Sequence, residues 1–423
     1  MPRIAIIGAG PAGLTLALLL HKHNIPSTIF ELRQKLTDET LSEPAGSLDL
    51  HEGSGLTAIR ECNVFDEFTS LTGDCTEELR IADKNGNIIY EDKGELSNRP
   101  EIARPKIIKL LIDHLPVESV KWGYRLVRAR RIQSSPWNPD ANANAKTEIE
   151  LDFGENGKHT FDFVIGADGA WSRVRAALLT NVQPQYAGMH LITLDIRQIT
   201  TKYPHLAEYI GQGTFNSLGH GHGVCAQRSV QDSARIYIFL STDDENFTTT
   251  TGLKDMTHVD AGKHLLNDNS LFGDWGTRAK ELISVACNDE TSNKPNAKIN
   301  IRPLYKLPNG HKWPHQCDAT AIGDAAHLMN PPAGEGVNIA MLDALLLSQA
   351  IIKAHETAAA HDVDCGLFLD ALDPFLKEFE AHMAVRAKEM AKHTAEISGM
   401  MFGGEDGASV LADWFKSFQA GTS

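Results

Sequence analysis

The apolar positions at the start of the chain follow the pattern of a strand, a helix and a second strand. Residues 3–7 form a short β-branched run, which is typical of a strand buried on both faces. Residues 14–23 are rich in leucine and alanine and predict a helix, with Asn24 as its left-handed C-terminal residue and Pro26 beyond it. Residues 27–31 predict the second strand. The chain therefore opens with a βαβ unit.

The middle of the chain predicts mostly strands. A helix is expected over residues 105–115, with Pro105 suited to its first position. Beyond it, residues 117–165 alternate apolar and polar positions, and residues 186–240 are rich in strand-forming segments, which predicts antiparallel pairing. Polar tracts that we expect to be loops lie at 134–144, 242–251 and 288–298.

The strand-then-helix pattern of the first residues occurs again near the end of the chain. Residues 319–322 predict a strand, and residues 336–352 and 367–400 predict helices. A final apolar stripe marks one face of a last helix and consists of Leu411, Trp414, Phe415 and Phe418. We expect this helix to dock on the body of the protein, because it is short and carries few cations.

Three glycines in the first turn carry the clearest chemical signal. Gly8, Gly10 and Gly13 form a GxGxxG motif between the first strand and the first helix, and Glu31 ends the second strand. The glycines permit a tight turn, a close approach of a pyrophosphate and close packing of the helix, while Glu31 can accept hydrogen bonds from a ribose. The motif predicts a bound dinucleotide but does not choose between NAD and FAD.

A second group of residues favours a flavin. Asp324 follows the strand at 319–322, and Gly334 and Gly336 precede the helix at 336–352. A strand-end carboxylate can accept hydrogen bonds from a flexible polyol. The glycines leave room for a flat ring over the helix N-terminus, whose dipole would stabilise negative charge on that ring. A reduced isoalloxazine is such a ring, and a simple helix entry would not need Asp324.

Charge and cysteine content narrow the range of partners. The 423 residues include 40 basic and 55 acidic side chains, which gives a formal net charge of −15. Such a surface repels nucleic acid and anionic lipid. The six cysteines lack metal-ligand spacing, and no apolar run reaches the ~20 residues of a membrane span. We expect a cytoplasmic protein without a metal, a nucleic-acid partner or a membrane.

Three motifs together resemble the group A flavoprotein monooxygenases. They are GAGPAG with Glu31, residues 166–169 with Ser172 and Arg175, and residues 323–338 with Asp343. Residues 46–55 and 100–104 narrow the resemblance to the tetracycline-inactivating flavin monooxygenases.

The resemblance implies an α/β fold with a glutathione-reductase-like Rossmann FAD-binding domain. Together with the order of elements, it predicts that this domain is formed by residues 1–180 and 304–365. Residues 181–303 are expected to form an inserted, mainly antiparallel β-sheet substrate domain, and residues 366–423 to add C-terminal helices.

The family assigns contacts with FAD to the positions of Asp49, Arg104 and Asp324. Asp168 is also expected to bind FAD, and together with Arg175 it is expected to hold a strand-to-helix turn and not to act in catalysis. The other residues expected to hold FAD are Gly8, Gly10, Pro11, Ala12, Gly13, Glu31, Leu32, Arg33, Ser47, Gly323, Pro331, Gly334, Gly336, Val337 and Asn338.

The activity implied by the resemblance is oxygenation. NAD(P)H, a transient co-substrate, reduces FAD, O₂ adds at the flavin C4a, and the hydroperoxide transfers one oxygen to a polycyclic phenolic or enolic substrate. The cofactor supplies this chemistry, so we expect no dedicated catalytic residue. We expect a monomer that oxidises tetracyclines or another polyketide.

Departures from the family concern the reductant and the substrate. Ser42 stands where the family has an arginine that contacts the nicotinamide, so we expect weak NADPH binding with little preference over NADH. The positions expected to contact substrate are Thr193, Phe215, His220 and Pro332, and of these only His220 matches the family pattern.

Three other functions are open at this point. A flavin-dependent halogenase would carry a WxWxIP-type segment, which none of the six tryptophans forms. A flavin reductase or dehydrogenase would lack oxygen insertion, and a non-catalytic flavin-binding protein would lack turnover. His220 and His222 have no carboxylate or cysteine beside them in sequence and are interpreted as loop histidines, not metal ligands.

Overall fold

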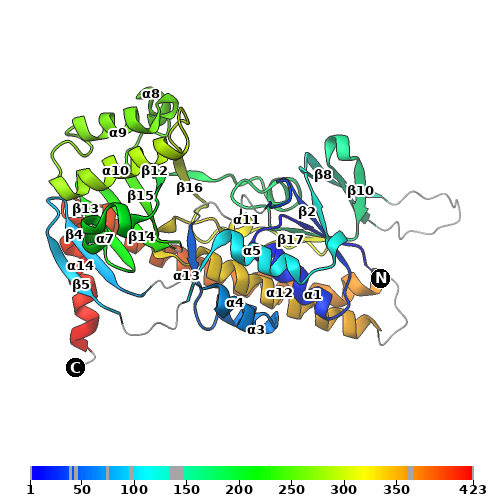
Figure 1. Ribbon diagram of the computed structural model, residues 1–423. Helices are drawn as coiled ribbons and strands as arrows, with labels where there is room; N and C mark the ends of the chain where they lie inside the picture. The colour runs from blue at the N-terminus through cyan, green and yellow to red at the C-terminus, as the bar shows by residue number, and fades with distance from the viewer. Residues whose placement is uncertain are drawn as a thin grey trace, which may run out of the picture.

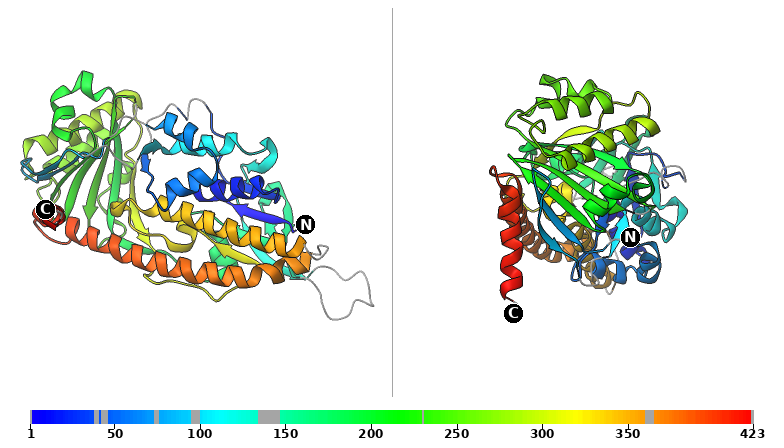
Figure 2. Two further views of the ribbon diagram at one scale, coloured as in Figure 1. Left: turned by 90° about the horizontal axis from the view of Figure 1, so that it is seen from below. Right: turned by 60° about the vertical axis from the view of Figure 1, so that its left-hand side comes forward.

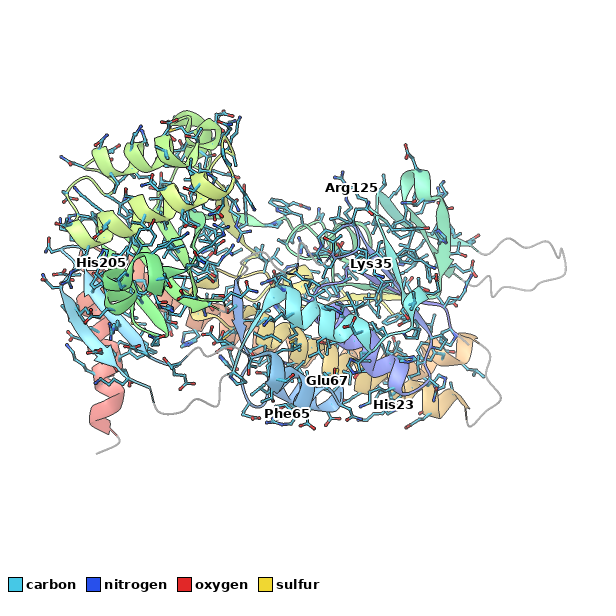
Figure 3. All side chains as sticks on the ribbon, in the orientation of Figure 1. His23, Lys35, Phe65, Glu67, Arg125 and His205 are labelled. Atoms are coloured by element: carbon cyan, nitrogen blue, oxygen red, sulfur yellow. The ribbon has the colours of Figure 1, made fainter. Side chains whose placement is uncertain are left out.

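The computed structural model describes residues 2–37, 41, 46–72, 76–94, 100–133, 147–229, 231–359 and 365–421. Two lobes lie side by side, and the long helix α13 (Cys365–Phe402) runs along both of them (Figures 1 and 2). Figure 3 adds the side chains, with Lys35 and Arg125 marking the lobe that contains the N-terminus and His205 marking the other lobe.

The N-terminal lobe is built on a parallel five-stranded sheet. β1 (Ile4–Ile7) lies at its centre, and all four of its residues are buried because both faces of the sheet are covered. The strand order is β17-β11-β1-β2-β7, and every pairing is parallel. The other strands are β2 (Ser27–Glu31), β7 (Val120–Trp122), β11 (Phe163–Gly166) and β17 (Ala319–Ala321). Residues 117–165 were expected to form antiparallel strands, and this expectation is wrong for β7 and β11, which pair in parallel.

Helices cover this sheet. α1 (Pro11–Lys22) follows β1, and Asn24 just beyond it has a φ of 56°, which confirms the expected left-handed residue. α12 (Gly336–Ala359) packs against α1 and α13 in the core of the lobe. It is long and apolar enough to cross a membrane, but most of its residues are buried inside the protein. The same lobe also contains α3 (Gly55–Glu61), α4 (Phe65–Leu71), α5 (Arg104–Asp113) and the short α11 (Asp324–His327).

Two small antiparallel sheets extend this lobe. The first joins β3 (Ser47–Asp49) to β6 (Glu101–Ala103). The second has the order β10-β9-β8 and comprises β8 (Arg128–Gln133), β9 (Thr147–Asp152) and β10 (Lys158–Phe161). The loop expected at 134–144 lies outside the described residues.

The other lobe is built on a seven-stranded sheet of order β16-β12-β15-β14-β13-β4-β5. Its pairings are antiparallel except that of β13 with β4. The strands are β4 (Leu79–Asp83), β5 (Ile88–Asp92), β12 (Gln185–Ile196), β13 (Thr214–Gly219), β14 (His222–Ser229), β15 (Ser233–Ser241) and β16 (Ile301–Lys306).

β4 and β5 change the expected domain boundaries. The expectation assigned all of residues 1–180 to the cofactor-binding domain, whereas β4 pairs along its whole length with β13 in the other lobe. β16 likewise pairs with β12 across the expected boundary at residue 303. An alternating pattern identifies a short strand but does not tell which of two sheets it joins.

Helices cover one face of the seven-stranded sheet and form a second hydrophobic core with it. α10 extends to Asn293, so the loop expected at 288–298 is helical in its first part. Asp289 and Glu290 are buried there beside Arg197, and this ion pairing explains how so polar a segment packs against the sheet. The helices are α6 (Ile199–Lys202), α7 (Pro204–Ile210), α8 (Phe247–Thr250), α9 (His258–Asn267) and α10 (Thr277–Asn293).

The opposite face of the sheet meets the C-terminal helices. Leu411 of α14 (Gly407–Gly421) and Met401 of α13 are buried against Leu218 and Phe239 of the sheet. Trp414 and Phe415 are partly buried in the same cluster, and Phe415 stacks on Tyr90 with 5.6 Å between the ring centroids. The expectation that this last helix docks on the body of the protein is confirmed.

Phe215 lies on the helix-covered face, which contradicts the expectation that it contacts substrate. Its side chain is 0% exposed and packs on the ring of Tyr209 with 4.8 Å between the centroids. Phe215 pairs with Ala226, which in turn pairs with Ile236, and all three side chains point into the helix-covered core. The side chain of Phe215 therefore faces away from the C-terminal helices and the N-terminal lobe.

This placement predicts the effect of a substitution. Phe215→Ala should lower the free energy of unfolding by about 3–5 kcal/mol, because a fully buried aromatic ring leaves a cavity. Denaturant-induced unfolding followed by circular dichroism measures the change. Thr193→Ala, a half-buried position on the other face, is the control and should stay within about 1 kcal/mol of the unsubstituted protein. Equal stability of Phe215→Ala and the unsubstituted protein would contradict the assignment.

Candidate active site

The turn between β1 and α1 is shaped by two glycines that leave no room for a side chain. Gly8 has a φ of 112°, and a Cβ there would lie 2.2 Å from the carbonyl oxygen of Ala167. A Cβ on Gly13 would lie 2.1 Å from the carbonyl oxygen of Gly8. At Gly10, by contrast, a Cβ would meet no atom within 4 Å. Gly8 and Gly13 therefore serve backbone packing, and Gly10 keeps the surface of the turn open.

The N-terminus of α1 suits an anion. No side chain caps this helix, and its first turn contains no acidic residue. The first N–H groups of a helix have no partner within it and carry partial positive charge. Pro11 has no N–H, so the amides of Ala12 and Gly13 are the first donors of the turn. The arrangement fits the pyrophosphate of a dinucleotide.

Glu31 lies at the end of β2, next to this turn. Its carboxylate accepts hydrogen bonds from the amide of Ala9 (2.7 Å) and from the amide of Arg33 (2.8 Å). Burial opposes ionisation, but the hydrogen bonds from Arg33 and Ala9 outweigh it and lower the pKa of Glu31. The Arg33 guanidinium donates to the other two acceptor positions, over 2.7 Å to Oε1 and 3.3 Å to Oε2, so a ribose hydroxyl would take the place of the longer of these contacts. Leu32 and Arg33 beside it are exposed.

Asp324 begins the short helix α11 (Asp324–His327) at the end of β17, and its side chain is exposed. Gly323 before it has a φ of 60°, and its amide donates to the carboxylate of Asp343 over 3.1 Å. Asp343, which is 1% exposed, also pairs with His327 (2.5 Å) and Arg386 (3.3 Å). This buried carboxylate on α12 fixes the strand end that presents Asp324. Arg386 was not identified from the sequence.

Asp168 holds its own turn, as expected. Its carboxylate accepts from the Ser172 hydroxyl (2.5 Å) and the Arg173 amide (2.7 Å), and burial raises its pKa. Arg175 donates to the carbonyl of Ala325 over 2.7 Å and so ties this turn to α11.

Asn338 joins β3 to the start of α12. It is 0% exposed, donates to the carbonyl of Asp49 (3.0 Å) and accepts from the amide of His51 (2.8 Å). Gly334 has a φ of 70°, and a Cβ there would lie 3.6 Å from a carboxylate oxygen of Asp49. The side chain of Asn338 therefore positions Asp49 beside the glycine-containing loop. Nearby, Ser47, Pro332 and Val337 are half-buried, while Pro331 is exposed.

Arg104 connects this region with the seven-stranded sheet. Its guanidinium is accessible to solvent but is closely surrounded by protein, and the resulting desolvation lowers its pKa against the opposing effects of Asp324 and Tyr237. Its amide donates to the carbonyl of Gly46 over 3.0 Å, and a Cβ on Gly46 would lie 3.2 Å from the Tyr237 hydroxyl. Asp324, Arg104 and Tyr237 therefore lie around one region between the two lobes.

The sheet presents polar side chains toward that region. Thr193 of β12 lies directly opposite Tyr237 of β15, so both side chains are on the same face. Two residues along, Arg235 pairs with Asp195 over 3.2 Å. Burial and the nearby Glu290 raise the pKa of Asp195 to about 6, while Arg235 opposes this shift. Tyr237 and Arg235 were not identified from the sequence, where they are two alternate positions of an ordinary strand.

His220 is not placed with these residues. It lies in the turn after β13, with a φ of 52°, and its amide donates to the carbonyl of Glu405 over 2.9 Å. Its ring lies 3.9 Å from the carboxylate of Asp274. Asn216, which shares a row of the sheet with Tyr237, is four residues away, or about 13 Å along the strand. The expected hydrogen bond from His220 to substrate has no support in this geometry.

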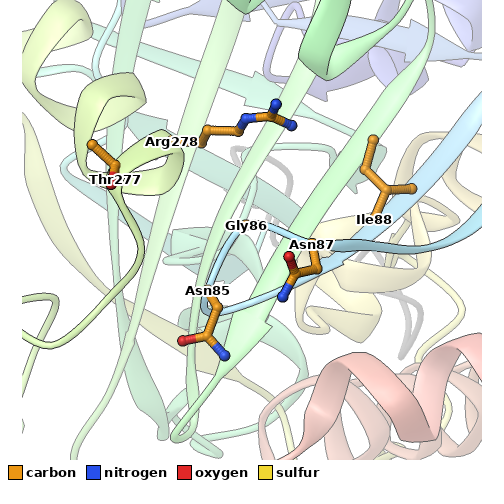
Figure 4. A pocket seen from close by; sticks show the side chains of 6 residues that line it. All are labelled: Asn85, Gly86, Asn87, Ile88, Thr277 and Arg278. Carbon is orange, nitrogen blue, oxygen red and sulfur yellow. The ribbon is translucent and has the colours of Figure 1, made fainter.

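An open cavity of about 590 Å³ lies elsewhere on the same lobe, at the turn between β4 and β5 (Figure 4). None of the residues expected to bind cofactor or substrate lines it, and its side chains come from that turn and from the start of α10. Among the described residues, no group of three or more His, Cys, Asp and Glu side chains could hold a metal ion.

Comparison with known proteins assigns this site. A family model described as "FAD binding domain" matches residues 2–269 and 320–364. The chain is 34% identical to the monooxygenase penA of Penicillium thymicola over 93% of both chains. The chain therefore belongs to the FAD-binding-domain family and is an FAD-dependent monooxygenase of that family.

Solved structures share the fold. A salicylate hydroxylase in complex with its substrate matches with a TM-score of 0.70 at 18% identity, covering 99% of this chain and 94% of that one. The tetracycline destructase Tet(51) matches with a TM-score of 0.62 at 15% identity, covering 99% of this chain and 97% of that one. The expected resemblance and fold class are confirmed.

The residues described above fit FAD. The open turn at Gly10 and the free amides of α1 suit the pyrophosphate, Glu31 suits the adenosine ribose, and Asp324 suits the ribityl chain. The loop before α12, with Asp49 and Arg104 beside it, would hold the ring. When bound, FAD supplies the redox chemistry and the activation of O₂.

The two types of glycine in the first turn should respond differently to alanine. Gly10→Ala should fold normally but bind FAD at least about tenfold more weakly, because its methyl group would stand where the pyrophosphate approaches. Gly8→Ala should unfold at markedly lower temperature, because its Cβ would meet a backbone carbonyl. Thermal unfolding and FAD titration measure both effects. Identical behaviour of the two variants would refute this division of roles.

Asp324→Ala tests the contact with the ribityl chain. We expect FAD affinity to fall roughly 10- to 150-fold, which corresponds to the loss of a hydrogen bond to a charged group, about 1.5–3 kcal/mol. The circular dichroism spectrum should not change, because the side chain is exposed. Flavin content after purification and fluorescence titration of the apoprotein measure the effect, and full FAD occupancy would overturn the assignment.

Proposed function

We propose that this monooxygenase uses NADH or NADPH and O₂ to hydroxylate a polycyclic phenolic or enolic molecule. The balanced reaction is substrate–H + O₂ + NAD(P)H + H⁺ → substrate–OH + NAD(P)⁺ + H₂O. One oxygen atom enters the substrate, and the other leaves as water with the two electrons of the reductant. We further propose that the enzyme acts as a cytoplasmic monomer. Ser42, the position that motivates a weak preference for NADPH, lies outside the described residues.

The observation that carries the proposed substrate class is the polar face opposite the cofactor region. Thr193 and Tyr237 offer hydroxyl groups, and Arg104 adds positive charge nearby, whereas the charge of Arg235 is paired with Asp195. Phenolates and enolates are the electron-rich forms that accept an electrophilic oxygen, and this set of donors would stabilise their negative charge. This face continues under the C-terminal helices, so a flat, fused-ring molecule would lie against the part of the sheet around Thr193 and Tyr237.

Tetracycline serves as a test compound within this class. The support for it comes from residues that border the cofactor and from the destructase structure at 15% identity. Of the expected substrate contacts, neither Phe215, which departs from the family pattern, nor His220, which matches it, faces this region. We therefore propose that tetracyclines are oxygenated, but less efficiently than the natural substrate.

Tyr237→Phe should lower kcat/KM roughly 2- to 12-fold, because the hydroxyl removed contributes one ordinary hydrogen bond to the substrate. NAD(P)H oxidation, O₂ consumption and product mass are measured with tetracycline and with a panel of polycyclic phenols. Tyr209→Phe is the matched control, since that hydroxyl donates to the carbonyl of Gly86 on the other face of the sheet.

Two outcomes would refute the proposed function. One is reduction of FAD by NAD(P)H without any product that has gained one oxygen atom, which would indicate a reductase. The other is an equal loss of kcat/KM in Tyr237→Phe and Tyr209→Phe, which would remove the argument that the polar face binds the substrate.

A further inference from the structure

His51 lies between two carboxylates at the edge of the cofactor region. Its Nε2 is 2.9 Å from Oδ2 of Asp49, and its Nδ1 is 3.3 Å from Oε1 of Glu335. The imidazole side chain is only 15% exposed. Asp49 belongs to β3, and Glu335 directly precedes α12, so the ring joins two segments that are far apart in the sequence.

This arrangement requires the charged form of His51. Each ring nitrogen faces a carboxylate, which only accepts hydrogen bonds, so both nitrogens must carry a proton. Hydrogen bonds to Asp49 and then to Glu335 raise the pKa of His51 to about 9. Two other polar side chains lie next to His51. Asn338 on α12 is neutral, and the carboxylate of Glu52 is already paired with Arg60 of α3 at 2.6 Å.

The cation reduces the negative charge beside the cofactor. With His51 charged, the three side chains carry a net charge of −1; with a neutral residue there, Asp49 and Glu335 would carry −2 with no cation between them. Asp49 also borders Gly334, in the loop that would hold the isoalloxazine ring. A second uncompensated charge would oppose the negative charge that the ring gains on reduction.

We propose that His51 is a positioning residue for FAD. It holds Asp49 and Glu335 in place and cancels one of their two negative charges, and so it sets both the affinity for FAD and the reduction potential of the bound cofactor. This inference rests on FAD binding alone and does not depend on the identity of the oxygenated substrate.

His315 provides a matched control. Its Nδ1 is 2.7 Å from Glu380 and its Nε2 is 2.9 Å from Asp373, both on α13, and its side chain is 22% exposed. It therefore has the same kind of environment as His51. None of its described contacts is with a residue expected to bind cofactor.

The test compares His51→Gln with His315→Gln by FAD titration of the apoproteins and by spectroelectrochemical measurement of the midpoint potential from pH 6 to 10. At pH 7, His51→Gln should bind FAD roughly 10- to 100-fold more weakly and have a lower potential, whereas His315→Gln should match the unsubstituted protein. As pH rises through about 9 and the cation is lost, the affinity of the unsubstituted protein should fall. Its potential should fall there by more than the decline that proton uptake by the flavin causes in every variant. Both of these steps should be absent in His51→Gln.

Glu335→Gln supplies a second variant if His51→Gln does not fold. Removing one carboxylate partner lowers the pKa of His51, so the step near pH 9 should move to lower pH. The proposal is overturned if His51→Gln retains the affinity and potential of the unsubstituted protein, if His315→Gln changes them equally, or if the step stays in place in Glu335→Gln. These measurements use neither NAD(P)H nor substrate, so failure of the oxygenation assay would leave them unaffected.

Discussion

The cofactor lobe depends on the contact of bare backbone between the first glycine turn and the end of β11. Gly8 approaches the carbonyl of Ala167, and Gly13 approaches the carbonyl of Gly8, so closely that no Cβ fits at either glycine. This contact brings the start of α1 against the carboxyl ends of β1 and β11. The uncapped amides, Glu31 and the turn that contains Asp168 then lie at one edge of the sheet, where ligands of open α/β folds bind.

Buried charges hold the remaining elements against that edge. Asp343 on α12 reaches the amide of Gly323 and pairs with His327 and with Arg386 of α13. A buried carboxylate needs several donors to remain ionised, and these donors come from two segments, the turn and helix at residues 323–327 and α13. The same ion pairs that satisfy Asp343 therefore bring β17, α12 and α13 into one arrangement. His51 likewise joins two segments, β3 and the residues before α12, through its ion pairs with Asp49 and Glu335. Unlike Asp343, these two carboxylates lie beside the cofactor region.

The cofactor lobe could be predicted from the sequence because its signals are local. Gly8, Gly10, Glu31 and Asp324 stand next to strands whose apolar runs are unmistakable, and the left-handed Asn24 ends α1 where expected. The placement of β4 and β5 could not be predicted, because it depends on a parallel pairing with β13 more than a hundred residues away. The extent of α10 was missed for a related reason: Asp289 and Glu290 are polar in sequence but buried by ion pairs with Arg197.

The substrate wall was the least predictable part, and its geometry explains why. Along β13 and β15 successive side chains alternate between the helix-covered core and the opposite face, which packs on the C-terminal helices and borders the cofactor region at Tyr237. A displacement of one residue along a strand therefore exchanges a residue on one face for a residue on the other, and Phe215 is a core residue for this reason. Tyr237, by contrast, is recognised as a candidate substrate contact only when its position beside Gly46 and its effect on the pKa of Arg104 are known. A cofactor site formed by turns can therefore be predicted despite a displacement of one residue, whereas a substrate site formed by one face of a sheet cannot.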